Sequence, residues 1–453
     1  MTTTIADALA GFVKEFRLTN APKDIVERIR LAILDTLGCI VFGSLNSSCS
    51  VLKGVVSDVS SSKRASVIGT DITTWPPMAA LTNGTMGHRF DFDDGISQAC
   101  GLHAGISVVP AVLAVGESIR SSGNSVLEAT IVGYEVGARI GRAVKSREVY
   151  LRGFHAHGIL AGFAAAAACA HLLDLSRKQT SNALSAAACF SPVSAWTAFP
   201  SGGMSKDAYG GWPSMLGIMA CYLAQEGFTS PADVFENKFG FYNIIADRFE
   251  AGEIFEGLGD RFVFPQSHYY KPHSTCRLAH NPADCALSIV RTNHILADQI
   301  KQIRVVASDV VWNLPTGGPN PINDIQARAS IHYGVAAAIL YGDLGVDSFS
   351  DSAIANASVR ELAGKVQILV DPSLASIYPR RPIQVEVVTK DGKYFAQTMD
   401  SERSLDRQGV IDKFRNLALR VYPAQTVAKV QELILSIDRV TDVGRILELL
   451  RKQ

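Results

Sequence analysis

The sequence has no excess of either charge, because 43 lysines and arginines balance 43 aspartates and glutamates. Proteins whose main task is to coat nucleic acid or an anionic membrane normally carry a basic excess. We therefore predict no nucleic-acid partner and no membrane partner for this chain. The balance still allows a local basic pocket for a small acidic ligand.

Ordered cysteine spacing is also missing. The eight cysteines are scattered and form no Cys-x-x-Cys pair or Cys/His ladder, so we expect neither a structural zinc site nor a disulfide framework. The first residues lack the basic start and apolar core of a signal peptide. The longest apolar run, 158–170, is shorter than a bilayer span of about 20 residues. These absences predict a reducing, cytoplasmic location.

Apolar residues are abundant, at 47% of the chain against 19% charged residues. This composition provides ample material for large cores and excludes a disordered chain. A length of 453 residues fits three domains of average size or two larger ones.

Most of the first 265 residues have the apolar periodicity of helices. Alanine-dense runs within this part favour helices that pack closely. We therefore predict a large all-helical domain over residues 1–265. Its clearest predicted helices cover 126–143, 159–173, 177–189 and 215–225.

The pattern changes near residue 265, where short segments of alternating apolar residues begin. We predict a smaller α+β domain over 266–403 and a helical return to the large domain over 404–453. The fold class is therefore mostly α with an α+β second domain. The expected strands cover 300–307, 366–370, 383–389 and 394–398, with a hairpin turn at Asp391-Gly392 and helices at 282–291 and 325–341.

Acids and histidines gather in the segment 83–105. Asp91, Asp93 and Asp94 lie within four residues, near His88 and His103, and could supply a general base and a general acid. A solvated, acid-capped loop is the plainer interpretation of the same residues. A magnesium or calcium site is a third, although the acids lack the regular spacing of a calcium loop.

Two further segments carry titratable groups beside helices. His155 and His157 precede a predicted helix, where imidazoles can act as neutral bases and anions are attracted. Lys206 follows a glycine pair and could meet a carboxylate or phosphate, although the spacing of a Walker loop is absent. Both segments could instead be ordinary surface loops.

The fourth segment, 270–280, lies at the predicted domain junction, where pockets are common. It places Lys271 and Arg277 near His280. Cys276 could be a nucleophile beside His280, but a small buried packing residue is the simpler interpretation. Lys271, like Lys206, occupies a loop marked by glycine or proline, which predicts a role in binding more than in folding.

Six strings in this order resemble the MmgE/PrpD family. They are NGTMGHRFDFDDG, LHAGISVVPAVLAVGE, GFHAHG, GGMSK, YKPHSTCRLAH and IQARASIHYGVAAAILYGD. The resemblance covers about residues 10–450. It implies a large helical domain with a smaller α+β domain, an active site between them and a homodimer. Family members include 2-methylcitrate dehydratases, cis-aconitate decarboxylases and an iminodisuccinate epimerase, which act on small polycarboxylates without an organic cofactor.

The resemblance also implies roles for individual residues. It assigns catalysis to Asp91, His103, His155, Lys206 and Lys271. It assigns substrate binding to Lys206, Lys271 and Arg277, and we add His157 and His280 as neighbouring candidates. We predict no metal and no cofactor.

Two departures from the family pattern bear on the reaction. Gly95 stands where the family usually has threonine, and Ala156-His157 replaces a common Pro-Thr pair. The spacing from the acids to His103 is nearer that of the dehydratases. We therefore expect a lyase that dehydrates a 2-methylcitrate-like hydroxy-tricarboxylate, with His157 as an extra proton donor. A cis-aconitate-type decarboxylase, a cofactor-free epimerase and an inactive binding protein remain alternatives.

Overall fold

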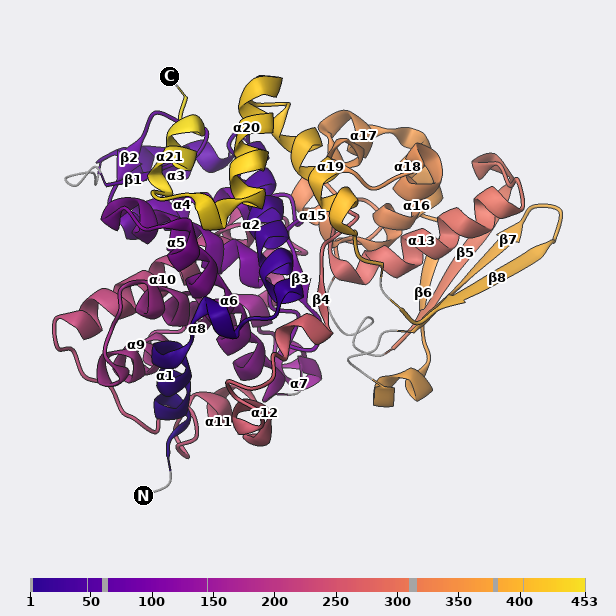
Figure 1. Ribbon diagram of the computed structural model, residues 1–453. Helices are drawn as coiled ribbons and strands as arrows, with labels where there is room; N and C mark the ends of the chain where they lie inside the picture. The colour runs from indigo at the N-terminus through magenta and orange to yellow at the C-terminus, as the bar shows by residue number, and fades with distance from the viewer. Residues whose placement is uncertain are drawn as a thin grey trace.

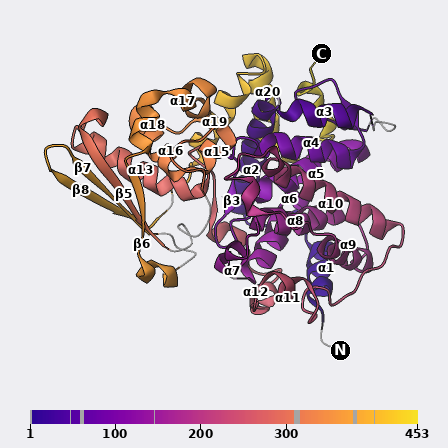
Figure 2. The same cartoon turned by 180° about the vertical axis from the view of Figure 1, so that it is seen from behind.

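Alanine and branched apolar residues at helical spacing build a large helical body, which adjoins a smaller body that contains a sheet (Figure 1). The computed structural model describes residues 3–46, 48–58, 64–144, 146–308, 316–377, 382–401 and 403–452. The two ends of the described chain lie at opposite ends of the helical body in both views (Figures 1 and 2). The predicted fold class is confirmed.

Helix α8 (Ala156–Leu172) runs through the core of the helical body and is buried from Ala156 to Ala170. It packs between α6 (Gly123–Arg142) and α10 (Ala208–Gln225). Close approach depends on small residues: a Cβ on Gly217 would lie 2.5 Å from the Cβ of Ala165. The other long helices of this body are α1 (Ile5–Glu15), α2 (Lys23–Gly43), α3 (Ser48–Asp58), α4 (Pro76–His88), α5 (Ala104–Ile119) and α9 (Arg177–Cys189). Among the described residues, none of these helices combines the length and the apolar character that crossing a membrane requires.

The smaller body contains a four-stranded sheet in the order β6-β5-β7-β8. Strand β5 (Ile300–Ala307) is parallel to β6 (Val366–Val370) and antiparallel to β7 (Ile383–Thr389), which pairs with β8 (Tyr394–Met399). Every second residue of β7 is buried, as expected for a sheet with one covered face. Helix α13 (Arg277–Thr292) contacts β7 and β8, and α16 (Ile331–Tyr341) packs beside α13.

The chain ends in helices that lie on the helical body. Helix α19 (Arg407–Ala418) packs along α2, α20 (Ala424–Leu435) also contacts α2, and α21 (Gly444–Leu449) contacts α5 (Figure 1). Their apolar residues join the same core as α1 to α10. The domain boundaries near 265 and 404 stay predictions.

Three predicted helices differ from the structure by more than the shifts of one to three residues seen for α6 and α8. Helix α10 begins at Ala208 and α13 at Arg277, and both starts are earlier than predicted. Each helix therefore contains a proline in its interior, whereas the prediction placed that proline at or before the helix start. The predicted helix 325–341 is two helices, α15 (Asp324–Ala329) and α16, because Ser330 adopts an extended backbone. Its hydroxyl accepts the Tyr333 N–H and so begins a new helix.

Candidate active site

Three helix ends and one short strand pair bring the predicted residues together. Helix α4 ends at His88 and leads into the acids, where Asp91 has a positive φ of 49° that Asp tolerates better than most residues. His103 and His155 occupy the N-cap positions of α5 and α8, and neither side chain makes a capping hydrogen bond. Strand β3 (Gly95–Ile96) pairs with β4 (His268–Tyr269), and this pairing sets Lys271 beside the acids.

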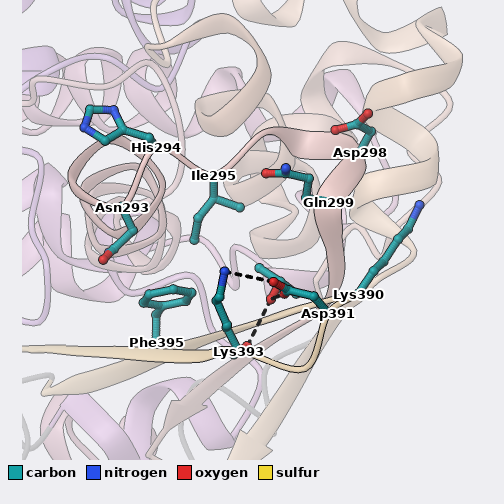
Figure 3. Close-up of a pocket in the computed structure, with 10 residues that line it drawn as sticks. Asn293, His294, Ile295, Asp298, Gln299, Lys390, Asp391, Lys393 and Phe395 are labelled. Carbon is teal, nitrogen blue, oxygen red and sulfur yellow. Dashed lines mark hydrogen bonds and ion pairs between the residues drawn. The ribbon is translucent and has the colours of Figure 1, made fainter.

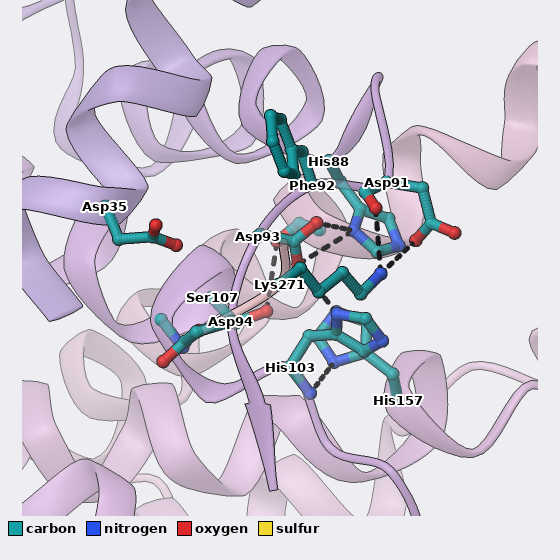
Figure 4. Close-up of polar contacts among 12 residues, drawn as sticks. Asp35, His88, Asp91, Phe92, Asp93, Asp94, His103, Ser107, His157 and Lys271 are labelled. Atoms are coloured by element: carbon teal, nitrogen blue, oxygen red, sulfur yellow. Dashed lines mark hydrogen bonds and ion pairs between the residues drawn. The ribbon is translucent and has the colours of Figure 1, made fainter. Parts of the chain in front are cut away.

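One side of the cluster is cationic. The Nζ of Lys271 lies 3.0 Å from Oδ1 of Asp91, and the Nζ of Lys206 lies 3.5 Å from the same oxygen. All three side chains are buried. Burial opposes ionisation of Asp91, but the two ammonium groups hold its pKa well below its ordinary value. Asp91 is therefore an anion held between two lysines. Figure 4 shows its contact with Lys271.

The other side carries imidazoles. Asp93 lies 3.1 Å from Nδ1 of His88 and 2.8 Å from Nδ1 of His103. The backbone N–H of His103 donates to Nδ1 of His157 over 3.3 Å. Burial, together with the nearby Lys206, lowers the pKa of His88 to about 4. Burial also lowers the pKa of His157 well below its ordinary range, so His88 and His157 are uncharged at neutral pH.

His155 continues this uncharged side toward aromatic residues. Its ring stacks on Trp196 with centroids 5.5 Å apart and lies 4.9 Å from the ring of Tyr209. Burial, with His88 and Lys206 nearby, lowers the pKa of His155 well below its usual value. The cluster therefore has a cationic side and an uncharged, aromatic side.

A deeper polar layer fixes the acid segment. Asp94 accepts hydrogen bonds from the Tyr134 hydroxyl at 2.6 Å and the Gly105 N–H at 3.1 Å, and lies 2.7 Å from Nε2 of His268. The Lys413 ammonium lies 2.8 Å from Asp35 and donates to the Phe92 carbonyl. Sequence reasoning named Asp94 but missed Tyr134, His268, Asp35 and Lys413, because these residues come from distant parts of the chain.

The burial of the cluster decides between the interpretations left open by the sequence. Asp93 and Asp94 have no exposed surface and Lys206 only 1%, so the solvated-loop and surface-lysine interpretations are wrong. Cys276 is 9% exposed and precedes α13, where its N–H donates to the Arg328 carbonyl, as a small buried packing residue would.

Arg277 and His280 lie in a neighbouring cluster at the start of α13. The Arg277 guanidinium lies 3.9 Å above the ring of Tyr269, and its Nη1 lies 3.0 Å from Nδ1 of His280. Nη1 also donates to the Arg403 carbonyl. These contacts tie Arg277 to the smaller body, so its predicted role in substrate binding stays a prediction.

Tyr269 also explains the glycine at position 95. Gly95 pairs with Tyr269 across β3 and β4. A Cβ on Gly95 would lie 2.4 Å from the Tyr269 hydroxyl oxygen and 2.6 Å from Cζ. The tyrosine ring therefore fills the space that a threonine side chain would need.

An ion network joins the helical body to the smaller body beside the cluster. Arg89 lies 3.3 Å from Asp207 and 2.7 Å from Asp324, and Arg328 lies 3.8 Å from Asp324. Burial raises the pKa of Asp207 to about 7, although Arg89 opposes that shift. The carboxyl of Asp207 is therefore partly protonated near neutral pH.

The ligand atoms of His88, Asp91, Asp93 and His103 lie within 4.8 Å of one another, a spacing that could hold a metal ion. Both carboxylates already have partners, since Asp91 is paired with two lysines and Asp93 with two imidazoles. A divalent ion would have to compete with these ammonium groups for Asp91. The absence of a metal from the reaction stays a prediction.

A separate hollow of about 490 Å³ lies at the edge of the smaller body, near the β7–β8 turn (Figure 3). Asp391 and Lys393 form an ion pair of 2.9 Å in it. The hollow contains His294 but none of the predicted site residues.

A buried carboxylate, two ammonium groups and several imidazoles define an enzyme-type site built for acid–base chemistry on an anion. Two family models match this architecture: the MmgE/PrpD N-terminal domain over residues 7–253 and the MmgE/PrpD C-terminal domain over residues 273–439. The chain belongs to the MmgE/PrpD family and is an enzyme of the lyase type.

Individual relatives include both decarboxylases and dehydratases. A "cis-aconitate decarboxylase" of Aspergillus terreus is 26% identical, over 95% of this chain and 92% of the relative. The human "cis-aconitate decarboxylase" is 24% identical, over 100% and 95%. A mitochondrial "2-methylcitrate dehydratase" of Yarrowia lipolytica is 21% identical, over 86% and 78%. Identities of 21–26% support membership of the family. They do not show which of the two reactions this chain catalyses.

Proposed function

We propose that this protein is a lyase of a small polycarboxylate and that its reaction is decarboxylation of a cis-aconitate-like, unsaturated tricarboxylate. The observation that carries the proposal is the division of the buried cluster into a cationic side and an uncharged side. A tricarboxylate bound between them would have some carboxylates paired with lysines and one without a cation.

The cationic side would bind the carboxylates that stay on the product. Lys206 and Lys271 are buried and converge on Asp91 within 3.5 Å, so a substrate carboxylate could share their charge. Charge-assisted hydrogen bonds of this kind are stronger than neutral ones. Asp91 would keep both ammonium groups oriented before the substrate arrives.

The uncharged side would bind the carboxylate that leaves. His155, Trp196 and Tyr209 surround this carboxylate with rings, and the nearby ammonium group of Lys206 already contacts Asp91 and the His88 carbonyl. A carboxylate without a counter-ion in such a setting is costly to hold. Carbon dioxide is neutral and escapes that cost, so this side would favour decarboxylation.

His103 would move the proton. The C–C bond to the leaving carboxylate breaks, carbon dioxide departs, and the electron pair moves through the double bond to the carbon that takes the proton. Nε2 of His103 first takes a proton from water, then delivers that proton to this carbon and regains its lone pair. Nδ1 of His103 stays bonded to Asp93 at 2.8 Å, which stabilises the charged ring.

Dehydration of a 2-methylcitrate-like hydroxy-tricarboxylate is the second candidate. Its support is the spacing between Asp91 and His103, which is nearer that of the dehydratases, and the two ammonium groups that could protonate a departing hydroxyl. The imidazole His157 supports it less than the sequence predicted, because a neutral ring is a poor proton source.

One experiment separates the candidates. The protein is mixed separately with cis-aconitate and with 2-methylcitrate in deuterated water, and products are followed by proton NMR. We expect stoichiometric carbon dioxide and one deuteron per product from cis-aconitate. Loss of water from 2-methylcitrate would establish the dehydratase instead. Deuterium washed into an otherwise intact polycarboxylate would indicate an epimerase, and no turnover an inactive binding protein.

We also propose a homodimer and, from the composition, a cytoplasmic location. Exposed apolar side chains support the dimer: Phe190 and Phe228, which contact each other, and Trp212 on α10 are each at least 43% exposed. Sedimentation equilibrium should give twice the chain mass of 48.6 kDa. A monomer at micromolar concentration would contradict the dimer.

A further inference from the structure

Three imidazoles form a triangle in the candidate site. The ring centroids of His88 and His103 are 5.2 Å apart, those of His88 and His157 5.2 Å, and those of His103 and His157 5.3 Å (Figure 4). His88 and His157 are almost fully buried, and His103 is only 12% exposed in its side chain. Each ring has one nitrogen engaged by a neighbour, which allows its protonation pattern to be deduced.

Asp93 fixes two of the rings in the same tautomer. An ionised carboxylate only accepts hydrogen bonds, so the nitrogen facing it must carry the proton. Nδ1 of His88 and Nδ1 of His103 both face Asp93, at 3.1 Å and 2.8 Å. Burial works against the charge on Asp93, but His88 and His103 keep its pKa well below the ordinary value. When either ring is neutral, its Nε2 therefore presents a lone pair.

His157 has the opposite tautomer. Its Nδ1 receives the backbone N–H of His103, so Nδ1 must present a lone pair. In a neutral ring the proton is then on Nε2. Nε2 of His157 and Nε2 of His88 are buried and have no hydrogen-bond partner among the described residues.

We infer that Asp93 is a positioning residue that presets two imidazoles as acceptors, and that His157 is a neutral hydrogen-bond donor to a substrate oxygen and not a proton source. The part that concerns substrate rests on the proposed function. A neutral imidazole that gave up its Nε2 proton would become an imidazolate, so His157 can polarise an oxygen but is poorly suited to protonate it. His103 and His88 are left as the rings able to accept a proton at Nε2.

The tautomers can be measured directly on the ligand-free protein. Nitrogen-15 NMR of labelled histidine side chains distinguishes a protonated Nδ1 from a protonated Nε2, and single His→Gln variants assign the signals. We expect protonated Nδ1 in His88 and His103 and protonated Nε2 in His157. Protonated Nδ1 in His157, or a cationic His157 at neutral pH, would overturn the inference.

Asp93→Asn tests the positioning role. The asparagine amide replaces one of the two carboxylate oxygens, both of which face Nδ1 of His88, by an N–H donor. At least one of His88 and His103 should therefore lose its fixed Nδ1–H tautomer, and kcat should fall more than KM rises. Glu128→Gln is the matched control, because Glu128 faces Nε2 of His171 at 3.3 Å away from the cluster. It should leave the three signals and kcat unchanged. An Asp93→Asn spectrum identical to wild type would refute the role.

Two substitutions of His157 separate donor from acceptor. Gln places an amide N–H at the distance of Nε2, whereas Asn places its oxygen at the distance of Nδ1 and offers no donor farther out. We expect His157→Gln to retain at least tenfold more kcat than His157→Asn at matched melting temperatures. The reverse order would overturn the donor assignment.

Failure of the tautomer assignment can be distinguished from failure of the proposed function. If no polycarboxylate is turned over, the proposed function fails while the wild-type NMR result still decides the tautomers. If turnover occurs with the opposite tautomers, only the present inference fails.

Discussion

Lys271 contributes to the stability of the fold as well as to the candidate site. As a loop residue before Pro272 it was expected to serve binding more than folding. In the structure it is fully buried, and its ammonium group holds both the side chain and the carbonyl of Asp91. Removing it would therefore affect both stability and activity.

We predict that Lys271→Ala lowers kcat/KM at least 100-fold, as for a lost charge-assisted contact of about 3 kcal/mol. It should also lower the free energy of unfolding, because breaking a buried ion pair costs about 3–5 kcal/mol. Kinetics and urea unfolding measure the two effects. The double variant Asp91→Asn, Lys271→Met should recover stability without activity. A stable and fully active Lys271→Ala protein would remove Lys271 from the site.

Asp207 predicts a pH dependence of stability. Its folded-state pKa of about 7 lies above its ordinary value of 3.8, because burial penalises the charged carboxylate. Its contribution to stability is therefore complete below the ordinary value and is lost as the pH rises through about 7.

We predict that Asp207→Asn gains stability relative to wild type as the pH rises from about 5 to about 8, since the neutral amide avoids that loss. Urea unfolding at both pH values measures the difference. Asp247→Asn, at an exposed ion pair, is the control and should show no such gain. A gap between Asp207→Asn and wild type that stays constant with pH would contradict the shift.

At the scale of elements, the β3–β4 strand pair holds two segments of the candidate site together. It joins the acid segment after α4 to the segment that carries Lys271. The pair packs tightly because Gly95 leaves room for the Tyr269 ring. A side chain at position 95 would push the two segments apart.

We predict that Gly95→Ala lowers the free energy of unfolding by about 1–3 kcal/mol, the usual cost of overpacking. Gly54→Ala in α3 is the control: its Cβ would meet no atom within 4 Å, so it should not destabilise. Adding Tyr269→Leu should relieve part of the loss, since it removes the clashing ring atoms. Denaturant unfolding of the four proteins checks this, and an unperturbed Gly95→Ala would show that the ring moves freely.

At the scale of the whole molecule, the cluster lies where the helical body meets the smaller body. Arg89 and Asp207 come from the first, and Asp324 and Arg328 from the second. The positive charge that a polycarboxylate needs is already supplied by ammonium groups in this junction. We therefore propose that substrate binding needs no metal ion.

We predict that exhaustive chelation leaves turnover unchanged. Activity is measured before and after dialysis against EDTA, with metal content checked in both samples. Loss of activity that one divalent ion restores would show instead that His88, Asp91, Asp93 and His103 hold a metal.

The sequence by itself determined the fold class, the family and three of the four sheet strands to the residue. Strands β5, β6 and β7 have their predicted bounds because alternation of apolar residues is a local pattern that a covered sheet face requires. The residues at 91, 103, 155, 206 and 271 were singled out from local motifs. The structure brings them together, and their catalytic roles stay predictions.

Only the tertiary structure decided how those residues are charged and oriented. Whether Asp91 is solvated or held between two lysines, and whether His157 gives or receives a hydrogen bond, depends on partners up to 180 residues away in the chain. Burial and partner charges set pKa values and tautomers, and both arise from packing between distant segments. The local sequence around each residue therefore does not predict its pKa or its tautomer.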